Sequence, residues 1–280
     1  MSKSKENYKL TEIESAYFAY KWIIQNIEFD KKSFDNGNDL AGLVTIFKEG
    51  KGGAIGISTL FNSLCGLLNI ESNSIFGLTK TITLNYTKII QIRNYAWNYI
   101  LIDGEYYLID PSLRAGFCKD KDLSTNCTDY YFGTNPEEFI RFHFPNDNKW
   151  QLLSEPITKD NFTSMAFLFE YFYILGFKTI YPDIQTTKAF KMMQVRLTGD
   201  DSVEKIFDDL HFMDMARIEG ESPMFSLSFS VDKIKSGLYG FDYKFYDTGL
   251  YEISTERKSD NTYYPLLCFE AYKNNTFKKN

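Results

Sequence analysis

The chain of 280 residues carries a formal net charge of -6 and has a sequence pI near 5.2. This length is typical of about two domains, and an apolar fraction of 44% is enough for packed cores rather than a disordered chain. The acidic balance gives no electrostatic reason to expect nucleic-acid binding, and no stretch approaches the roughly 18 consecutive apolar residues of a membrane span. The histidines are only His143 and His211. A metal site built from several histidines is therefore not expected, and any Ser–His or Cys–His mechanism must use one of these two.

The first residues are polar, and no apolar signal core follows them. If Met1 is the native start, this pattern favours a cytoplasmic protein without Sec-type export. The cysteines Cys65, Cys118, Cys127 and Cys268 form no C-x-x-C pair, and we predict reduced thiols, with a Cys118–Cys127 disulfide as the main alternative. Neither a cofactor nor a metal is predicted.

Helical spacing of apolar residues dominates the first part of the chain. Helices are predicted over residues 11–28, 39–48 and 54–69. Thr11 and Glu14 form a capping box that opens the first helix. The glycine-rich run 50–53 ends the second helix and leads directly into the third, which begins near Ala54.

The pattern then changes to the alternation and β-branched runs that are typical of strands. Strands are predicted over residues 74–83, 88–92, 95–102, 105–110, 225–231, 239–246, 249–254 and 263–272. Asp103-Gly104 is a favoured type I′ turn, so a hairpin is expected around it. Residues 112–165 are predicted to form an ordered but irregular cover over the core. We therefore predict an α+β protein with two domains, residues 1–175 and an antiparallel β-sandwich over 176–280.

The start of the third helix has unsatisfied backbone N–H groups and a favourable dipole, which would stabilise a cysteine thiolate, but the residue there is Ala54. Residues 53–72 resemble the nucleophile segment of transglutaminase-like proteins. Residues 94–98 (NYAWN) and 106–110 (YYLID) are similar to the family's His-Ala-Trp-Asn and Trp-Tyr-x-x-Asp motifs. Residues 131–153 resemble the kyphoscoliosis-peptidase branch through their YF, HFP and WQLL segments.

The resemblance covers roughly residues 10–165 and implies a papain-like core with a Cys-His-Asp triad. Carried over residue by residue, the nucleophile position is Ala54, the histidine position is Tyr95 and the aspartate position is Asp110. Alanine has no nucleophile, and tyrosine, with a reference pKa of about 10, is a poor general base at neutral pH. We therefore predict a naturally non-catalytic protein, in which Asp110 has no imidazole to orient.

Ser58, Trp97 and Asn98 are predicted to lie beside the former catalytic cleft. Ser58 follows Ala54 by one helical turn and is interpreted as a small packing residue rather than a displaced nucleophile. Trp97 is assigned either to a surviving groove or to core support of the hairpin.

The remaining candidate residues are predicted to have structural roles. His143 belongs to a motif distinct from the catalytic one and is interpreted as a satisfied structural histidine, and His211 as a surface residue with acidic neighbours. Cys65 is predicted to be buried in the core. Tyr95 and Asp110 are expected to form a hydrogen bond across neighbouring strands.

The leading functional prediction is a pseudoenzyme that serves as a protein-binding or scaffold module, for which the resemblance implies cytoskeletal or cytokinetic roles. One alternative is an active cysteine-peptidase-like or transglutaminase-like enzyme with a non-standard nucleophile such as Cys118. Another is a carbohydrate- or cell-wall-binding protein, which an aromatic content of 17% would allow. A protein partner is expected, with no nucleic acid and no membrane span, and no oligomeric state is predicted.

Overall fold

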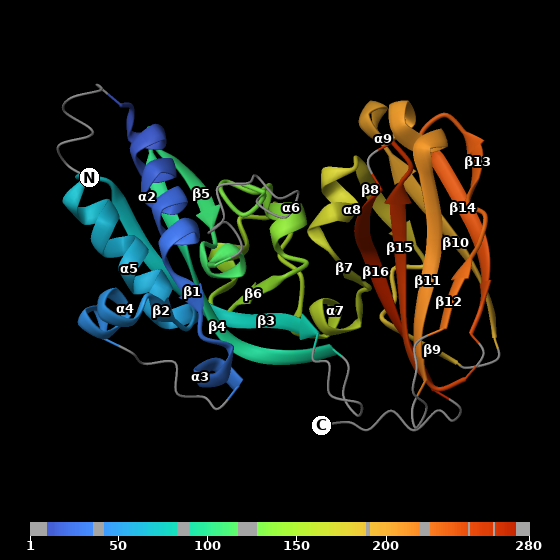
Figure 1. Ribbon diagram of the computed structural model, residues 1–280. Helices are drawn as coiled ribbons and strands as arrows, with labels where there is room; N and C mark the ends of the chain where they lie inside the picture. Colours follow the sequence, from blue (N-terminus) through green and yellow to red (C-terminus); the bar gives the residue numbers. More distant parts are fainter. Residues whose placement is uncertain are drawn as a thin grey trace. The chain divides into compact units, whose positions relative to one another are not determined.

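A computed structural model describes residues 10–35, 42–82, 90–116, 128–188, 191–218, 225–245, 247–259 and 261–272. The chain forms two compact units, Met1–Thr79 with Arg93–Pro156 and Lys80–Ile92 with Ile157–Asn280 (Figure 1). The division after Pro156 comes earlier than the predicted boundary between residues 175 and 176. The reason is that the strand β7 (Phe167–Leu168) pairs with β16 (Thr262–Tyr272) and so belongs to the second unit.

The first unit contains the predicted helices together with shorter ones. Their bounds are α2 (Glu12–Asn26), α3 (Lys31–Asp35), α4 (Leu43–Glu49), α5 (Ala54–Leu67), η1 (Ser112–Arg114), α6 (Pro136–Phe139) and η2 (Asn148–Gln151). The capping box is confirmed, because Glu14 N–H donates to Thr11 Oγ1 and Thr11 N–H donates to the Glu14 carboxylate. Helix α4 begins later than predicted, and residues 39–41 of that prediction lie outside the described residues.

The first unit also contains a four-stranded antiparallel sheet in the order β5-β4-β3-β6. Its strands are β3 (Glu71–Ile82), β4 (Ile90–Ile102), β5 (Glu105–Ile109) and β6 (His143–Pro145), and a separate parallel pair joins β1 (Glu28–Phe29) to β2 (Lys51–Gly52). Asp103 and Gly104 both have positive φ, 53° and 82°, which confirms the predicted hairpin turn. Strand β4 is continuous where two strands were predicted, and β6 lies within the segment predicted to be irregular.

Helices α2 and α5 pack against each other and bury their apolar faces against the sheet (Figure 1). Fully buried residues of this core include Tyr20 and Ile24 from α2, Phe61 from α5, and Ile100 and Ile109 from the hairpin strands. The periodicity that predicted the helices is therefore the burial pattern that holds them on the sheet.

Strand β6 approaches β3 most closely at Gly77. A Cβ atom at this position would lie 2.2 Å from the carbonyl oxygen of Phe144, 2.7 Å from the Trp97 ring and 2.8 Å from Cα of Pro145. Two of these three atoms belong to backbone, so they cannot move aside cheaply.

We expect Gly77→Ala to lower the free energy of unfolding by about 1–3 kcal/mol, because the added methyl group overpacks the contact between β3 and β6. Gly66→Ala is the matched control, since a Cβ at that position in α5 meets no atom within 4 Å. It should stabilise the helix by about 0.5–1 kcal/mol. Urea unfolding of both variants measures the difference, and equal effects of the two substitutions would contradict the close approach.

The second unit is built mainly from antiparallel strands in two sheets. One has six strands in the order β12-β11-β15-β16-β7, with β9 parallel to β16, and the other has the order β13-β14-β10-β8. The remaining bounds are β8 (Phe177–Tyr181), β9 (Thr186–Lys188), β10 (Met192–Gly199), β11 (Leu210–Ile218), β12 (Phe225–Ser228), β13 (Asp232–Lys235), β14 (Leu238–Lys244), β15 (Gly249–Arg257), α7 (Lys159–Ser164), α8 (Glu170–Ile174), α9 (Asp201–Ile206) and η3 (Phe207–Asp209). Helices α7, α8 and α9 were not predicted from the sequence. Within the described ranges, no helix is long and apolar enough to cross a membrane.

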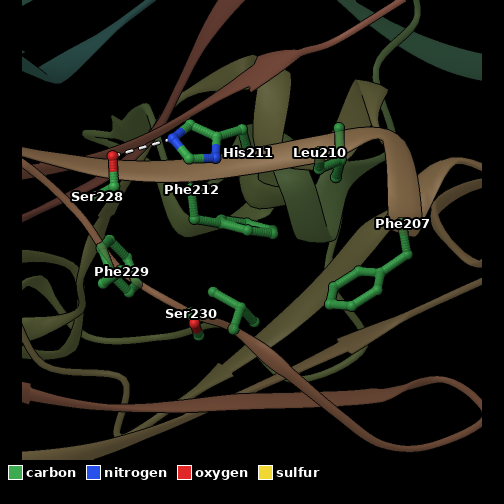
Figure 2. A pocket seen from close by; sticks show the side chains of 8 residues that line it. Phe207, Leu210, His211, Phe212, Ser228, Phe229 and Ser230 are labelled. Carbon is green, nitrogen blue, oxygen red and sulfur yellow. Dashed lines mark hydrogen bonds between the residues drawn. The ribbon is translucent and has the colours of Figure 1, made fainter.

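Aromatic side chains connect the two sheets of the second unit. The Phe245 ring, just after β14, lies 5.0 Å from the ring of Tyr251 in β15 and 5.8 Å from that of Phe269 in β16. The Tyr243 hydroxyl donates to the buried Asp214 carboxylate on β11. A pocket of about 310 Å³ opens beside β11, past the end of β12, and Figure 2 shows its lining of Phe207, Leu210, His211, Phe212, Ser228, Phe229, Ser230 and Val231.

Glu204 connects α9 to the hairpin of β13 and β14. Its carboxylate accepts hydrogen bonds from Lys233 Nζ, from the Gly237 N–H at 3.2 Å and from the Tyr239 hydroxyl at 3.0 Å. The hydrogen bond from Lys233 contributes most to a pKa of Glu204 below its ordinary value of 4.5. A lowered folded-state pKa stabilises the fold fully above that ordinary value, and the stabilisation is lost as pH falls through the folded-state pKa.

Glu204→Gln should therefore lower the thermal midpoint of the second unit near pH 7. The difference in thermal midpoint between Glu204→Gln and the unsubstituted protein should become smaller as the pH is brought below about 4, because the glutamate and the glutamine at position 204 are then both neutral. Calorimetric melts across this pH range measure this difference. Two parallel stability curves would contradict the role of the Glu204 charge.

Candidate functional site

The three residues predicted to stand at the family's triad positions are all inside the first unit. Ala54 is the first residue of α5, with Gly53 as its N-cap, and is 0% exposed. Tyr95 lies in β4 and is 3% exposed, and Asp110 directly follows β5 and is 0% exposed. The helix start thus has the geometry that would stabilise a thiolate, but a methyl group stands there.

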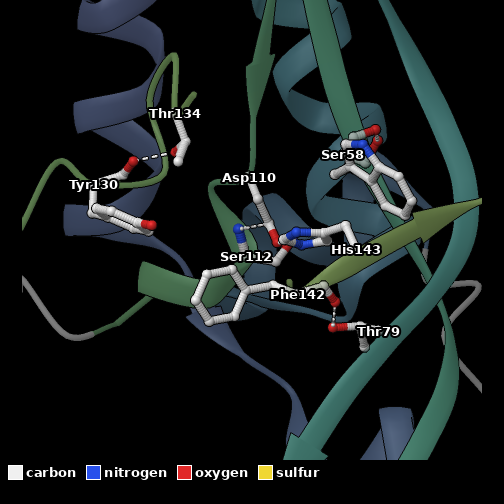
Figure 3. Close-up of polar contacts among 9 residues, drawn as sticks. Ser58, Thr79, Asp110, Ser112, Tyr130, Thr134, Phe142 and His143 are labelled. Atoms are coloured by element: carbon white, nitrogen blue, oxygen red, sulfur yellow. Dashed lines mark hydrogen bonds and ion pairs between the residues drawn. The ribbon is translucent and has the colours of Figure 1, made fainter. Parts of the chain in front are cut away.

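The carboxylate of Asp110 is fully engaged inside the protein (Figure 3). Its Oδ1 accepts a hydrogen bond of 2.7 Å from the Ser112 N–H, and its Oδ2 lies 2.8 Å from Nε2 of His143. Both side chains of the Asp110–His143 pair are completely buried. The prediction that Asp110 has no imidazole to orient is therefore wrong, because His143 reaches it from β6 instead of from the family's histidine position.

His143 is held on its sides by aromatic rings. Its imidazole stacks on the Phe139 ring with centroids 4.1 Å apart, and lies 4.9 Å from the Trp97 ring and 5.7 Å from the Tyr95 ring. The backbone of His143 is held by its pairing with Thr79 in β3. This packing agrees with the structural role predicted for His143. The prediction that its ring nitrogens are hydrogen-bonded holds only for Nε2, because Nδ1 is buried without a hydrogen-bond partner among the described residues.

A general base must lie within hydrogen-bond reach of the nucleophile that it activates. In the described part of the chain, Nδ1 of His143 meets no thiol or hydroxyl, and Nε2 is occupied by Asp110. The pair therefore has two members of a triad's chemistry, an imidazole and a carboxylate, without the third.

Tyr95, the residue predicted for the histidine position, has a buried phenol. Burial, and next the negative charge of Asp110, raise the pKa of Tyr95 well above its ordinary value of 10.0. The hydroxyl forms no hydrogen bond with the described residues, although Asp110 and Ser112 lie near it, so the expected Tyr95–Asp110 hydrogen bond is not made. The ring packs edge-on against Phe34 at 5.7 Å.

Ser58, Trp97 and Asn98 are core residues rather than the lining of an open cleft, since they are 0%, 1% and 0% exposed. Ser58 Oγ lies 2.7 Å from Ser74 Oγ and donates to the Trp97 carbonyl oxygen at 3.1 Å. Asn98 Nδ2 donates to the Ser58 carbonyl oxygen at 3.0 Å and to Asn62 Oδ1 at 2.7 Å. These bonds join α5 to β3 and β4, which excludes Ser58 as an accessible nucleophile.

Two cysteines are described, Cys65 and Cys268, and both are buried thiols outside any disulfide among the described residues. Burial raises the pKa of Cys65 to about 12, so this thiol is neutral and unreactive at physiological pH, as predicted for a core residue. Cys118 and Cys127, with the alternative disulfide between them, lie outside the described residues. His211 is half-buried in β11, with Nε2 3.0 Å from Ser228 Oγ, at the pocket of Figure 2.

Removing the His143 side chain should lower the free energy of unfolding more than neutralising Asp110 does. His143→Ala leaves a buried carboxylate without its second partner, which we expect to lower the free energy of unfolding by about 3–5 kcal/mol. Asp110→Asn can still accept from Ser112 and donate to His143, so about 1–3 kcal/mol is expected.

A double-mutant cycle checks this order. The coupling free energy between positions 110 and 143 should be about 0.5–3 kcal/mol in urea unfolding. Additive effects within the error of the measurement would show that the two side chains do not depend on each other.

Comparison with known proteins identifies a family and several proteins to which this chain is similar. The model of the transglutaminase-like superfamily matches residues 2–111. Human kyphoscoliosis peptidase is 25% identical over 177 residues, which cover 62% of this chain and 27% of that protein. Cytokinesis protein 3 of Schizosaccharomyces pombe is 27% identical over 165 residues (58% of this chain, 18% of that protein), and hillarin of Drosophila melanogaster is 28% identical over 185 residues (59% and 22%).

The chain thus spans about a quarter or less of the length of these curated relatives. The family model and the matches to kyphoscoliosis peptidase agree with the motifs in residues 53–72, 94–98, 106–110 and 131–153. Residues 2–111 thus match the transglutaminase-like superfamily, and these matches support a likeness of the chain to the kyphoscoliosis-peptidase branch.

Proposed function

We propose that this protein is a non-catalytic transglutaminase-like pseudoenzyme that acts as a protein-binding or scaffold module. In this proposal the first unit is a papain-like core, in which Ala54, Tyr95 and Asp110 occupy the nucleophile, histidine and aspartate positions, and the second unit is a β-sandwich. The observation that carries the proposal is the Asp110–His143 pair, whose imidazole reaches no nucleophile among the described residues while Ala54 stands at the start of α5.

The size of the expected loss supports a non-catalytic protein. In a nucleophile–base–carboxylate unit, losing the nucleophile or the base alone costs on the order of 10⁶ in kcat. Here the nucleophile position has a methyl group, and the position of the base has a phenol that stays protonated at neutral pH. Neither side chain can take up or release a proton at the step where the family's chemistry begins.

Burial supports the same proposal independently of residue type. Ala54 and Asp110 have no exposed surface, and Tyr95 is only 3% exposed. A peptide substrate has to reach the reacting atoms within about 3–3.5 Å, which closed packing of this kind prevents.

A cluster of aromatic side chains on the first unit supports protein binding. The Tyr99 and Trp150 rings stack 4.4 Å apart, Tyr106 meets Trp150 edge-on at 5.4 Å, and the Tyr106 side chain is 43% exposed. Tyrosine and tryptophan dominate binding energy at protein interfaces, because they bury a large rigid surface and keep a polar end. One relative is a cytokinesis protein, and we propose a cytokinetic or cytoskeletal setting for the partner.

A thiol-reactive substrate mimic tests the lack of catalysis. We expect iodoacetamide and a peptide aldehyde to leave Cys65 and Cys268 unmodified at pH 7, because both thiols are buried and the Cys65 pKa is raised to about 12. Peptide mapping by mass spectrometry reads out every cysteine. Stoichiometric modification of one cysteine faster than a free thiol, lost in Cys118→Ser, would establish an active enzyme with a non-standard nucleophile.

Restoring the two missing groups provides a positive control for the assigned positions. In the double variant Ala54→Cys/Tyr95→His, the pKa of the thiol introduced at position 54 should be lower than in Ala54→Cys alone, because a histidine cation lowers the pKa of a neighbouring thiol. The ultraviolet absorbance of the thiolate measures this pKa without a reagent having to reach the buried position. Equal thiol pKa values in both variants would refute the assignment of position 95.

A further inference from the structure

The pocket of the second unit has the composition of a binding site for an aromatic group. Three phenyl rings, those of Phe207, Phe212 and Phe229, line it together with aliphatic and hydroxyl side chains (Figure 2). Its volume of about 310 Å³ lies at the small end of the range for ligand pockets. An indole or phenol ring could meet the phenyl groups edge-on, the geometry that aromatic pairs prefer.

The pocket lies where β11 extends beyond the end of the neighbouring strand β12. Strand β12 ends at Ser228, opposite Met213, whereas β11 continues back to Leu210. One further backbone bond, from the Phe229 N–H to the Phe212 carbonyl oxygen, follows the end of the ladder. Within the described residues, Leu210 and His211 pair with β15 alone, and beside β12 only the Phe212 carbonyl oxygen is bonded, to Phe229, so this side of the stretch is a short strand edge.

A strand edge beside a side-chain pocket is the arrangement that recognises extended peptides. Backbone hydrogen bonds along the edge supply affinity, and the pocket selects one side chain of the added strand. A free small molecule would use the pocket but not the edge, which favours a polypeptide as the occupant.

Polar groups at the pocket restrict the sequence of that peptide. The His211 imidazole and the Ser228 hydroxyl, 3.0 Å apart at Nε2 and Oγ, lie on the other side of β11 from the Phe212 ring (Figure 2), so they face residues next to the aromatic one rather than its ring. Glu256 pairs with His211 across the sheet, and Asp208 lies exposed between two lining residues. Lys258 is close by, donating to the Asp208 carbonyl oxygen. Together with Asp209, these residues give three carboxylates against two basic residues, Lys258 and Arg257, and the Arg257 guanidinium is held over the Tyr264 ring. The excess of negative charge favours a peptide with basic residues beside the aromatic one.

We infer that this pocket binds an extended segment of a partner protein, with an aromatic side chain in the pocket, basic residues beside it and its backbone along β11. The inference rests on the proposed protein-binding function and gives it a site and a recognition mode. It does not depend on the missing nucleophile, since a protein with active cysteine chemistry could use the same pocket.

The test is a titration of the ¹⁵N-labelled full chain with acetylated, amidated pentapeptides. Lys-Thr-Trp-Thr-Lys should shift the amide resonances of Leu210, His211 and Phe229 and bind about tenfold or more tightly than Lys-Thr-Ala-Thr-Lys. N-acetyltryptophanamide, which has the ring without the strand, should bind more weakly than the tryptophan pentapeptide. Glu-Thr-Trp-Thr-Glu should also bind more weakly than the lysine form at low salt.

Two substitutions of the same kind complete the experiment. Val231→Trp fills the pocket from its own lining and should reduce the affinity for Lys-Thr-Trp-Thr-Lys at least about tenfold, whereas Ile234→Trp on the neighbouring exposed strand β13 should leave it unchanged. The dispersed amide spectrum of each variant reports that it is folded. Equal binding of the tryptophan and alanine peptides, equal binding of the free amide, or an undiminished affinity in Val231→Trp would overturn the inference. The thiol-labelling result would stand in every one of these outcomes.

Discussion

The carboxylate of Asp110 and the imidazole of His143 meet at 2.8 Å with no exposed surface on either side chain, and the packing of the first unit depends on this contact. A buried carboxylate is tolerated only when its oxygens are paired. The Ser112 N–H and His143 Nε2 satisfy that requirement, while the backbone N–H of Asp110 donates to the Tyr131 carbonyl oxygen. The segment after β5 and the strand β6 are thus joined through one side chain.

The same contact explains why β6 lies where it does. Three residues are too few to form a stable strand by propensity alone, yet His143–Pro145 pairs with β3 over Gly77–Thr79. The Thr79 hydroxyl donates to the Phe142 carbonyl oxygen, and the His143 ring stacks on Phe139. Side-chain contacts on both faces therefore hold β6 in place, because its backbone hydrogen bonds alone would be too few. The missing side chain of Gly77 lets β6 come close enough to β3 for this pairing.

Local signals predicted much of the first unit. The capping box at Thr11, the Asp103-Gly104 turn and the start of α5 at Ala54 depend on neighbours within a few residues, and all are confirmed. The Asp110–His143 pair joins residues 33 positions apart, and no spacing rule connects them. The one available signal was that His143 is the only histidine of the first unit, the unit that also contains the family motif ending in Asp110. In the second unit β12, β14, β15 and β16 were predicted from alternation, whereas β7–β11 and β13 were not predicted as strands. Helices α7, α8 and α9 span only five or six residues, too few for a helical period to be recognised.

A catalytic aspartate and a structural aspartate make different demands on the same carboxylate. In a triad the carboxylate holds an imidazole whose other nitrogen faces the nucleophile, so the histidine must keep one side open. Here the imidazole reaches Asp110 from β6 and is enclosed by Phe139, Trp97 and Tyr95. Introducing a cysteine at position 54 and a histidine at position 95 would not by itself rebuild a triad, because the new histidine would have to compete with His143 for the Asp110 carboxylate that orients it. In the proposed non-catalytic protein, the alanine at the nucleophile position and the engagement of Asp110 by His143 would be two physically separate barriers to catalysis.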